Sequence, residues 1–144
     1  MGVYGDIFAK YPGRVFGLGV AVGEALKYVV SPDLKNLCSA VACVYILCHA
    51  SCQAFEARQT DGMVTSMYDA LIFDGLASVL IPSFVTYHTS RITFSCLKES
   101  TTVPDVVLTW GPTVVGLCML FLTTEPIDQY VNDALDDTVR KLYY

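Results

Sequence analysis

The chain has 144 residues, a length that suits a single domain, and only 16% of them are charged, whereas ordinary soluble domains carry about 25%. Its formal net charge of −5 argues against a nucleic-acid-binding protein, which needs a basic surface. Lys, Arg, Asp and Glu are all absent from residues 36–55, 75–90 and 106–124. Because about 20 apolar residues span the hydrocarbon core of a bilayer, we predict an all-α membrane protein, a single domain over residues 1–144, with about three transmembrane helices.

A soluble helical bundle is the competing interpretation. Its helices should each carry one polar face, but residues 37–48 show no strongly polar stripe at any helical period. Surrounding lipid explains this pattern better than surrounding water does.

The N-terminal segment, residues 1–35, is predicted to hold a helix that lies at the membrane interface or packs against the bundle. Residues 7–30 are apolar and rich in glycine, yet they include Glu24 and Lys27, which are costly in hydrocarbon. An interfacial or packed helix therefore suits this segment better than a fourth crossing, and the sequence leaves the crossing open. The Ser-Pro pair at residues 31–32 marks the start of the next helix.

The first spanning helix is predicted over residues 36–55. Four of the six cysteines lie in this stretch, and none of them forms a Cys-x-x-Cys pair of the kind that zinc and redox sites use. We interpret them as small packing residues and expect no metal or other cofactor.

The second spanning helix is predicted over residues 68–90. Its charge-free part begins only at residue 75, so a full crossing must extend back through Asp74. Pro82 in this helix and Pro112 in the third each lack the N–H that a helix needs, and we predict a bend at both positions.

Asp74 is the most unusual residue, because a carboxylate inside a membrane helix needs a partner. It could belong to a proton or ion relay, or it could be a carboxylate near the membrane border that caps the helix or contacts a Lys or Arg. The second role is favoured because the sequence offers no other buried ionisable residue to continue a path. His49 and His88 are expected to pack or hydrogen-bond near helix ends. Since no nucleophile motif or dinucleotide-binding glycine pattern is present, we expect the chain not to be an enzyme.

The third spanning helix is predicted over residues 106–124, with an end at Glu125. Residues 126–142 then form a separate amphipathic helix, whose apolar positions recur at helical spacing and whose other face is acidic. The residues of this tail that could dock a protein partner are Asp128, Asp136, Arg140, Lys141 and Tyr143.

The distribution of Lys and Arg predicts the orientation, because matrix-facing and cytoplasmic loops are enriched in these residues. Six of them lie on one side of the predicted spans and three on the other. The N-terminal side, with six, is predicted to face the matrix or the cytoplasm. The six are Lys10, Arg14, Lys27, Lys35, Arg91 and Lys98, and the three are Arg58, Arg140 and Lys141.

Several stretches resemble the mitochondrial fission process protein family. Residues 77–84 are similar to that family's Ala-Ser-Val-x-Ile-Pro-x-Phe core, and residues 126–143 are similar to its tail, with Pro-Ile-Asp at the start and Arg-Lys-Leu-Tyr at the end. Gly-Glu-Ala at residues 23–25 also matches, and Trp110 lies where the family has a tryptophan ahead of its last hydrophobic segment. The resemblance implies a non-enzymatic, multi-pass protein of the inner mitochondrial membrane, linked to membrane integrity and mitochondrial division. It also implies a matrix-facing N-terminus and a tail in the intermembrane space.

The leading functional hypothesis is a non-catalytic structural protein, an accessory subunit of a large inner-membrane assembly such as a respiratory-chain complex or ATP synthase. Its partners would be other subunits of that assembly and membrane lipids. Two alternatives stay open: a free-standing factor for mitochondrial fission and inner-membrane integrity, and a small proton or solute carrier that uses Asp74. Cardiolipin is the expected structural lipid. The cations that could hold its head group on the matrix side are Lys27, Lys35, Arg91 and Lys98.

Overall fold

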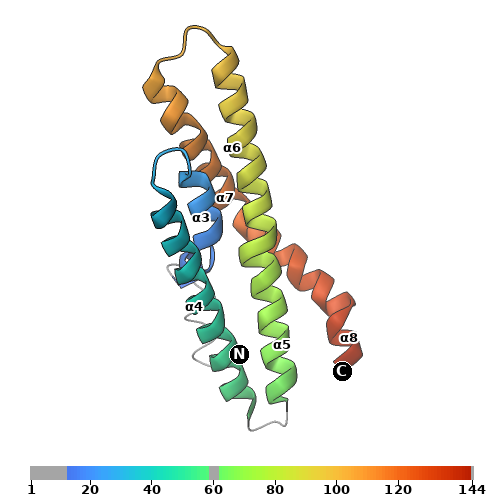
Figure 1. The fold of residues 1–144 in the computed structure, drawn as a ribbon. Helices are drawn as coiled ribbons and strands as arrows, with labels where there is room; N and C mark the ends of the chain where they lie inside the picture. Colours follow the sequence, from blue (N-terminus) through green and yellow to red (C-terminus); the bar gives the residue numbers. More distant parts are fainter. Residues whose placement is uncertain (1–12, 59–61, 144) are drawn as a thin grey trace.

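The computed structural model describes residues 13–58 and 62–143, and the elements named here belong to this part of the chain. Two short helices, α2 (Gly13–Gly17) and α3 (Gly19–Leu26), precede three long helical rods (Figure 1). The rods are α4 (Pro32–Ala57), then α5 (Met63–Asp74) continued by the π-helix η2 (Gly75–Leu80) and α6 (Ile81–Glu99), then α7 (Asp105–Asp137). A short helix, α8 (Val139–Tyr143), follows α7.

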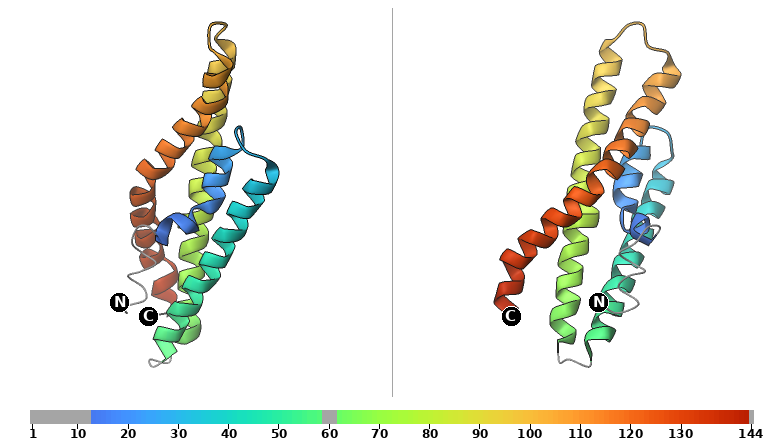
Figure 2. Two further views of the ribbon diagram at one scale, coloured as in Figure 1. Left: turned by 90° about the vertical axis from the view of Figure 1, so that its left-hand side faces the viewer. Right: turned by 180° about the vertical axis from the view of Figure 1, so that it is seen from behind.

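The three rods alternate in direction along the chain and pack into one elongated bundle (Figure 1; Figure 2). Each is long and apolar enough to cross a membrane: Pro32–Ala57, Met63–Glu99 and Asp105–Leu142. Pro32 begins α4 as predicted, because its fixed φ suits the first turn of a helix. No β-strand occurs in the described ranges. The predicted fold class, an all-α membrane protein with three transmembrane helices, is confirmed.

The second rod is longer than predicted at its C-terminal end. It reaches Glu99 instead of ending near residue 90. Residues 91–99 contain neither Gly nor Pro to interrupt the helix, and Phe94 stacks on Tyr28 with the ring centroids 4.8 Å apart. Residues 91–99, which follow the predicted second span, are therefore helical.

Glu125 is the predicted end of the third rod, but the helix continues past it through Pro126 to Asp137. Beyond Pro126 it buries Val131 and Leu135 in a small apolar core with Ala77 of η2. This packing offsets the backbone hydrogen bond that a proline removes. The first part of the predicted tail helix is thus the end of α7.

The N-terminal segment was expected to lie at the membrane interface or to pack against the bundle. The structure shows the second placement for helix α3. It contacts α4, α6 and α7, and its glycines Gly19 and Gly23 lie against α4. A Cβ atom on Gly19 would lie 2.3 Å from the backbone oxygen of Cys38, and one on Gly23 would lie 3.3 Å from the side chain of Lys35. Small residues four positions apart permit this close approach between membrane helices.

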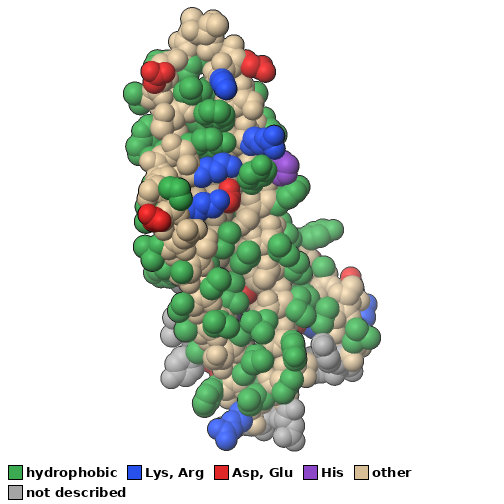
Figure 3. Space-filling view, in the orientation of Figure 1, with side chains coloured by type: hydrophobic (Ala, Val, Ile, Leu, Met, Phe, Trp, Pro, Cys, Tyr) green, Lys and Arg blue, Asp and Glu red, His purple; other side chains and the backbone are tan. Residues whose placement is uncertain are grey.

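The face that the second rod turns toward its neighbours is polar. Its buried polar residues are four or eight positions apart and so share one side of the helix: Asp74, Ser78, Thr86 and Ser90. Gly116 of α7 leaves room for the Ser90 hydroxyl, since a Cβ atom there would lie 2.4 Å from it. Large apolar side chains are exposed on the outside of the bundle, as Figure 3 shows for one face. Several polar groups inside the bundle and many large apolar groups outside suit a protein surrounded by lipid.

The tail is fastened to the second rod by an ion pair. Arg140 donates from Nε to Asp69 Oδ1 at 3.0 Å and from Nη2 to Asp69 Oδ2 at 2.8 Å. Asp136, one turn earlier, also accepts a hydrogen bond from Arg140. The bidentate geometry sets the position of the tail against α5.

Replacing Arg140 with Ala should loosen the tail and leave the bundle folded. The side chains of Arg140 and Asp69 are 29% and 27% exposed, so solvent screens the pair and its loss should cost about 1 kcal/mol. Limited proteolysis at the tail should become faster. The control is Lys141→Ala, because Lys141 pairs with Asp137 within the tail itself. Equal cleavage rates in the two variants would contradict this role of Arg140.

Candidate functional site

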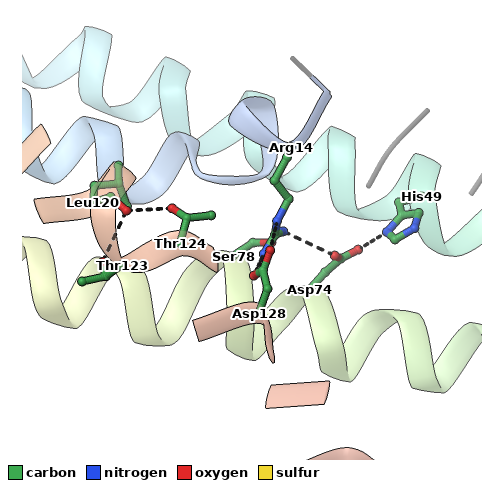
Figure 4. A network of polar contacts seen from close by, with 8 residues as sticks. All are labelled: Arg14, His49, Asp74, Ser78, Leu120, Thr123, Thr124 and Asp128. Atoms are coloured by element: carbon green, nitrogen blue, oxygen red, sulfur yellow. Dashed lines mark hydrogen bonds and ion pairs between the residues drawn. The ribbon is translucent and has the colours of Figure 1, made fainter. Parts of the chain in front are cut away.

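Charged and polar side chains from distant parts of the chain meet inside the bundle (Figure 4). We call this group the ionic cluster, and its members are Arg14, His49, Asp74, Ser78 and Asp128. They come from α2, α4, the end of α5, η2 and α7, respectively. The cluster therefore connects every rod of the bundle with the N-terminal segment.

Arg14 occupies the centre of the ionic cluster. Its side chain is 5% exposed and forms a bidentate pair with Asp128, in which Nε donates to Oδ2 at 2.9 Å and Nη2 donates to Oδ1. Nη1 donates to the hydroxyl of Ser78. The guanidinium also lies 5.6 Å from the centre of the Phe73 ring, within the range of a cation–π contact. A planar, forked donor is needed to make these contacts together, which is why arginine suits the position and lysine does not.

Asp74 is 1% exposed and lies beside two groups that stabilise a carboxylate. Its Oδ2 lies 2.6 Å from His49 Nδ1, and its Oδ1 lies 3.9 Å from Arg14 Nη1. These neighbours explain how a carboxylate is accommodated inside a membrane helix, where an unpaired one is costly. The favoured interpretation, a carboxylate near the membrane border, rested on the absence of any other buried ionisable residue. The structure contradicts that premise, because Arg14 is buried beside Asp74 inside the bundle.

A π-helical segment positions two members of the ionic cluster. η2 begins directly after Asp74, contains Ser78 and ends two residues before Pro82. A π turn is wider than an α turn, and such segments are frequent at functional sites. Pro82 has no N–H to donate to the preceding turn, so it suits the end of an irregular segment. Pro112 lies within the continuous helix α7, and bends at the two prolines stay predictions.

The ionic cluster can fix the positions of the segments that contribute to it. The guanidinium of Arg14 lies beside the two carboxylates, and His49 is a second partner of Asp74. Such a network is strongly destabilised when one member is removed, because the remaining charge stays buried without its partner. Within the described residues, no three His, Cys, Asp or Glu side chains are placed to hold a metal ion.

The structure brings together three of the four predicted lipid-binding cations. Lys27, Lys35 and Arg91 are connected through contacts with Glu24 and Tyr87. Lys98 lies two helical turns beyond Arg91 in α6, about 10 Å further along the helix axis.

Four of the predicted docking residues of the tail already contact other residues of this chain. Asp128 pairs with Arg14 inside the bundle, so its carboxylate is already engaged within the chain. Asp136 and Arg140 pair with each other, and Lys141 pairs with Asp137. The side chain of Tyr143 lies outside the described part of the chain.

Arg14 is the member of the ionic cluster whose central position sequence reasoning missed, because it was counted among the cations that flank the spans. The sequence contained one signal for it. Asp74, in a helix otherwise free of charge over most of its span, requires a cation or donor from elsewhere in the chain. Arg14 was also one of few cations in a segment expected to pack against the bundle, but its pairing with Asp128 joins residues 114 positions apart.

Comparison with known proteins gives near full-length matches. Mitochondrial fission process protein 1 of Caenorhabditis briggsae is 30% identical, over 96% of this chain and 92% of the relative. The chain belongs to the mitochondrial fission process protein 1 family. The members from Caenorhabditis elegans and Homo sapiens are each 29% identical, over 96% and 98% of this chain and 89% and 87% of their own lengths. No protein-family model and no solved structure matches the chain.

The comparisons overturn the leading functional hypothesis. These relatives are named for mitochondrial fission and not for a respiratory-chain complex or ATP synthase, so the expectation of an accessory subunit was wrong. The finding agrees with the alternative of a fission factor, and it associates the family with mitochondria. Hydropathy and charge patterns indicate insertion into a membrane, but they contain no information about the assembly that a membrane protein joins. No residue of the chain therefore supported the expectation of an accessory subunit.

Proposed function

We propose that this chain is a non-catalytic protein of the inner mitochondrial membrane that acts in mitochondrial fission. The observation that carries the proposal is the match, over nearly the whole chain, to relatives named for the fission process. Three helices able to span a membrane support an integral membrane protein. Its partners would be other proteins of the same membrane and its lipids.

In this role the ionic cluster holds the N-terminal segment and the three rods in fixed relative positions. We call this function the internal lock. Arg14 ties α2 to η2 and to α7, and beyond Asp128 the tail is held again by Arg140 and Asp69. A bundle locked in this way presents its outer surfaces to lipid and to partner proteins in a fixed geometry. Loss of the lock should therefore impair function without removing any group that contacts a partner.

The test of the function is complementation in cells that lack the protein. Their mitochondria should be elongated, because division slows while fusion continues. The wild-type chain should restore the normal length distribution, and Arg14→Met should fail to do so when the two proteins are present in equal amounts. Lys141→Ala is the control and should restore it. Normal mitochondrial length in cells without the protein would contradict the proposed function.

We also propose that the N-terminal end of α4 faces the matrix and the tail faces the intermembrane space. Arg14 is buried in the bundle and Lys10 lies outside the described residues, so neither counts as a flanking cation. The described Lys and Arg favour this orientation by four to three.

A single-cysteine variant that keeps Cys96 tests this orientation, since Cys96 is exposed near the C-terminal end of α6. In mitoplasts it should resist a membrane-impermeant maleimide and react after the membrane is opened. A cysteine introduced at the exposed position of Asp137 should react without opening. The reverse labelling pattern would reverse the proposed topology.

The carrier alternative assigns a different role to Asp74. It predicts that Asp74→Asn abolishes proton flux into proteoliposomes, whereas a lock predicts only a loss of stability. The contacts of Asp74 with His49 and Arg14 favour the lock, because both neighbours hold the carboxylate in place. Flux is measured with a pH-sensitive dye, and protein-free liposomes set the background. Flux by the wild-type chain above that background, lost in Asp74→Asn, would favour the carrier.

A further inference from the structure

We propose that Lys27, Lys35 and Arg91 form a binding site for the phosphate head group of an anionic phospholipid. This headgroup site lies at the level where α4 begins, with the α6–α7 hairpin extending beyond it (Figure 1), and Tyr28 and Tyr87 belong to it. The inference rests on the proposed membrane location and does not depend on the role in fission.

Contacts connect the three cations, although they come from three segments of the chain. Lys35 forms an ion pair with one oxygen of Glu24, and Lys27 Nζ lies 3.5 Å from the other oxygen. Lys27 Nζ also lies 4.1 Å from the centre of the Tyr87 ring. The Tyr87 hydroxyl in turn accepts a hydrogen bond of 3.3 Å from Arg91 Nη1. The cations therefore line one continuous surface.

The headgroup site is net positive, because its contacts join three cations and one carboxylate. The side chain of Glu24 is 17% exposed, whereas that of Lys35 is 37% exposed and Arg91 is also exposed. The carboxylate is thus less accessible than the two cations. Figure 3 shows Lys and Arg side chains gathered on the upper half of one face of the bundle. An approaching phosphate would meet the cations before it meets Glu24.

The position of the site along the helices is that of a membrane border. Lys35 directly precedes the charge-free stretch of α4, and Arg91 directly follows the charge-free stretch of the second rod. Two of the three apolar spans therefore end at the headgroup site, at the level where Lys and Arg meet lipid phosphates. On the charge-free side of Arg91, the exposed side chains of Tyr87 and Phe84 lie about one and two helical turns away on the same face of α6 and can contact acyl chains. This combination favours a lipid over a free phosphate ion, which gains nothing from the apolar neighbours.

Aromatic side chains complete the site. Tyr28 stacks on Phe94, and burial raises the pKa of Tyr28 above its ordinary value, with a further contribution from Tyr87. The phenol of Tyr28 is therefore uncharged at neutral pH and does not repel an anion. Tyrosine is enriched at this level of membrane proteins because it has both an apolar ring and a polar hydroxyl.

The test is lipid retention by the full chain purified in mild detergent. Micelles are supplemented with phosphatidylglycerol, with cardiolipin or with phosphatidylcholine, and the lipid that stays bound is measured by native mass spectrometry. The wild-type chain should retain the two anionic lipids and not phosphatidylcholine. Arg91→Gln should weaken retention roughly tenfold, and Lys35→Gln with Arg91→Gln should weaken it further, because each cation near a phosphate contributes separately.

The control is Arg58→Gln, which removes a cation at the opposite end of α4 and should leave retention unchanged. Thermal unfolding of each variant shows whether the bundle is still folded. Equal losses in Arg58→Gln and Arg91→Gln would overturn the proposal, because they indicate general electrostatic attraction. Displacement of the lipid by millimolar inorganic phosphate would overturn the assignment to a lipid. Lipid retention is measured on purified protein, whereas the proposed function is tested by complementation in cells. A negative result for the headgroup site can therefore be distinguished from a negative result for the role in fission.

Discussion

Replacing Arg14 with Met should lower the free energy of unfolding by about 3–5 kcal/mol, because it leaves the buried Asp74 and the partly buried Asp128 without their cation. Methionine keeps the unbranched apolar stem and removes only the charge and the donors. Unfolding can be measured by titrating the protein from mild micelles into a denaturing detergent. The single tryptophan, Trp110, provides a fluorescence signal for the third rod.

The control for Arg14→Met is a triple variant that also carries Asp74→Asn and Asp128→Asn. If an uncompensated charge causes the loss, the triple variant should recover much of the stability, because neutral amides cost less to bury than carboxylates. Arg14→Lys should be intermediate, since lysine keeps the charge but cannot make the forked contact with Asp128 and the contact with Ser78 at once. Equal stability of the wild type and Arg14→Met would show that the ionic cluster is not a lock.

Replacing Gly19 with Ala should destabilise the bundle by about 1–3 kcal/mol through overpacking. The new methyl group would meet the backbone oxygen of Cys38 at 2.3 Å. A backbone oxygen within a helix cannot move aside as a flexible side chain can, so α3 and α4 would have to separate. The same detergent titration measures the loss.

Gly75→Ala is the matched control for Gly19→Ala. A Cβ atom on Gly75 would have no neighbour within 4 Å. The substitution should therefore be neutral or stabilise the chain by up to about 1 kcal/mol, because alanine favours a helix more than glycine does. If both variants lose the same stability, the loss does not come from the contact between α3 and α4.

The glycines illustrate how much of the packing could be predicted. A small residue in an apolar span can mark a close approach between helices, and the structure shows such an approach at Gly116 but not at Gly75. Gly19 and Gly23 also lie close to a neighbouring helix, and their four-residue spacing is a known signal for such a contact. The spacing shows that a small face exists, but only the folded chain shows which helix lies against it.

The helix ends show the same limit. Pro126 and the charged residues after it predicted a stop, and in isolation the chain would favour one. The burial of Val131 and Leu135 with Ala77 outweighs that local preference. Residues 91–99 carry no helix breaker, and their helix is extended by the contact between Phe94 and Tyr28.

Membrane insertion, helical class and the number of rods follow from the sequence alone, because the cost of placing each residue in hydrocarbon is local and adds up along a segment. The family also follows from short motifs in the chain. The ionic cluster and the headgroup site do not, because each joins residues from separate segments whose proximity depends on all the contacts of the bundle together. Arg14 is a flanking cation by its position in the chain, and it becomes the centre of a buried lock only when α2 packs against η2 and α7.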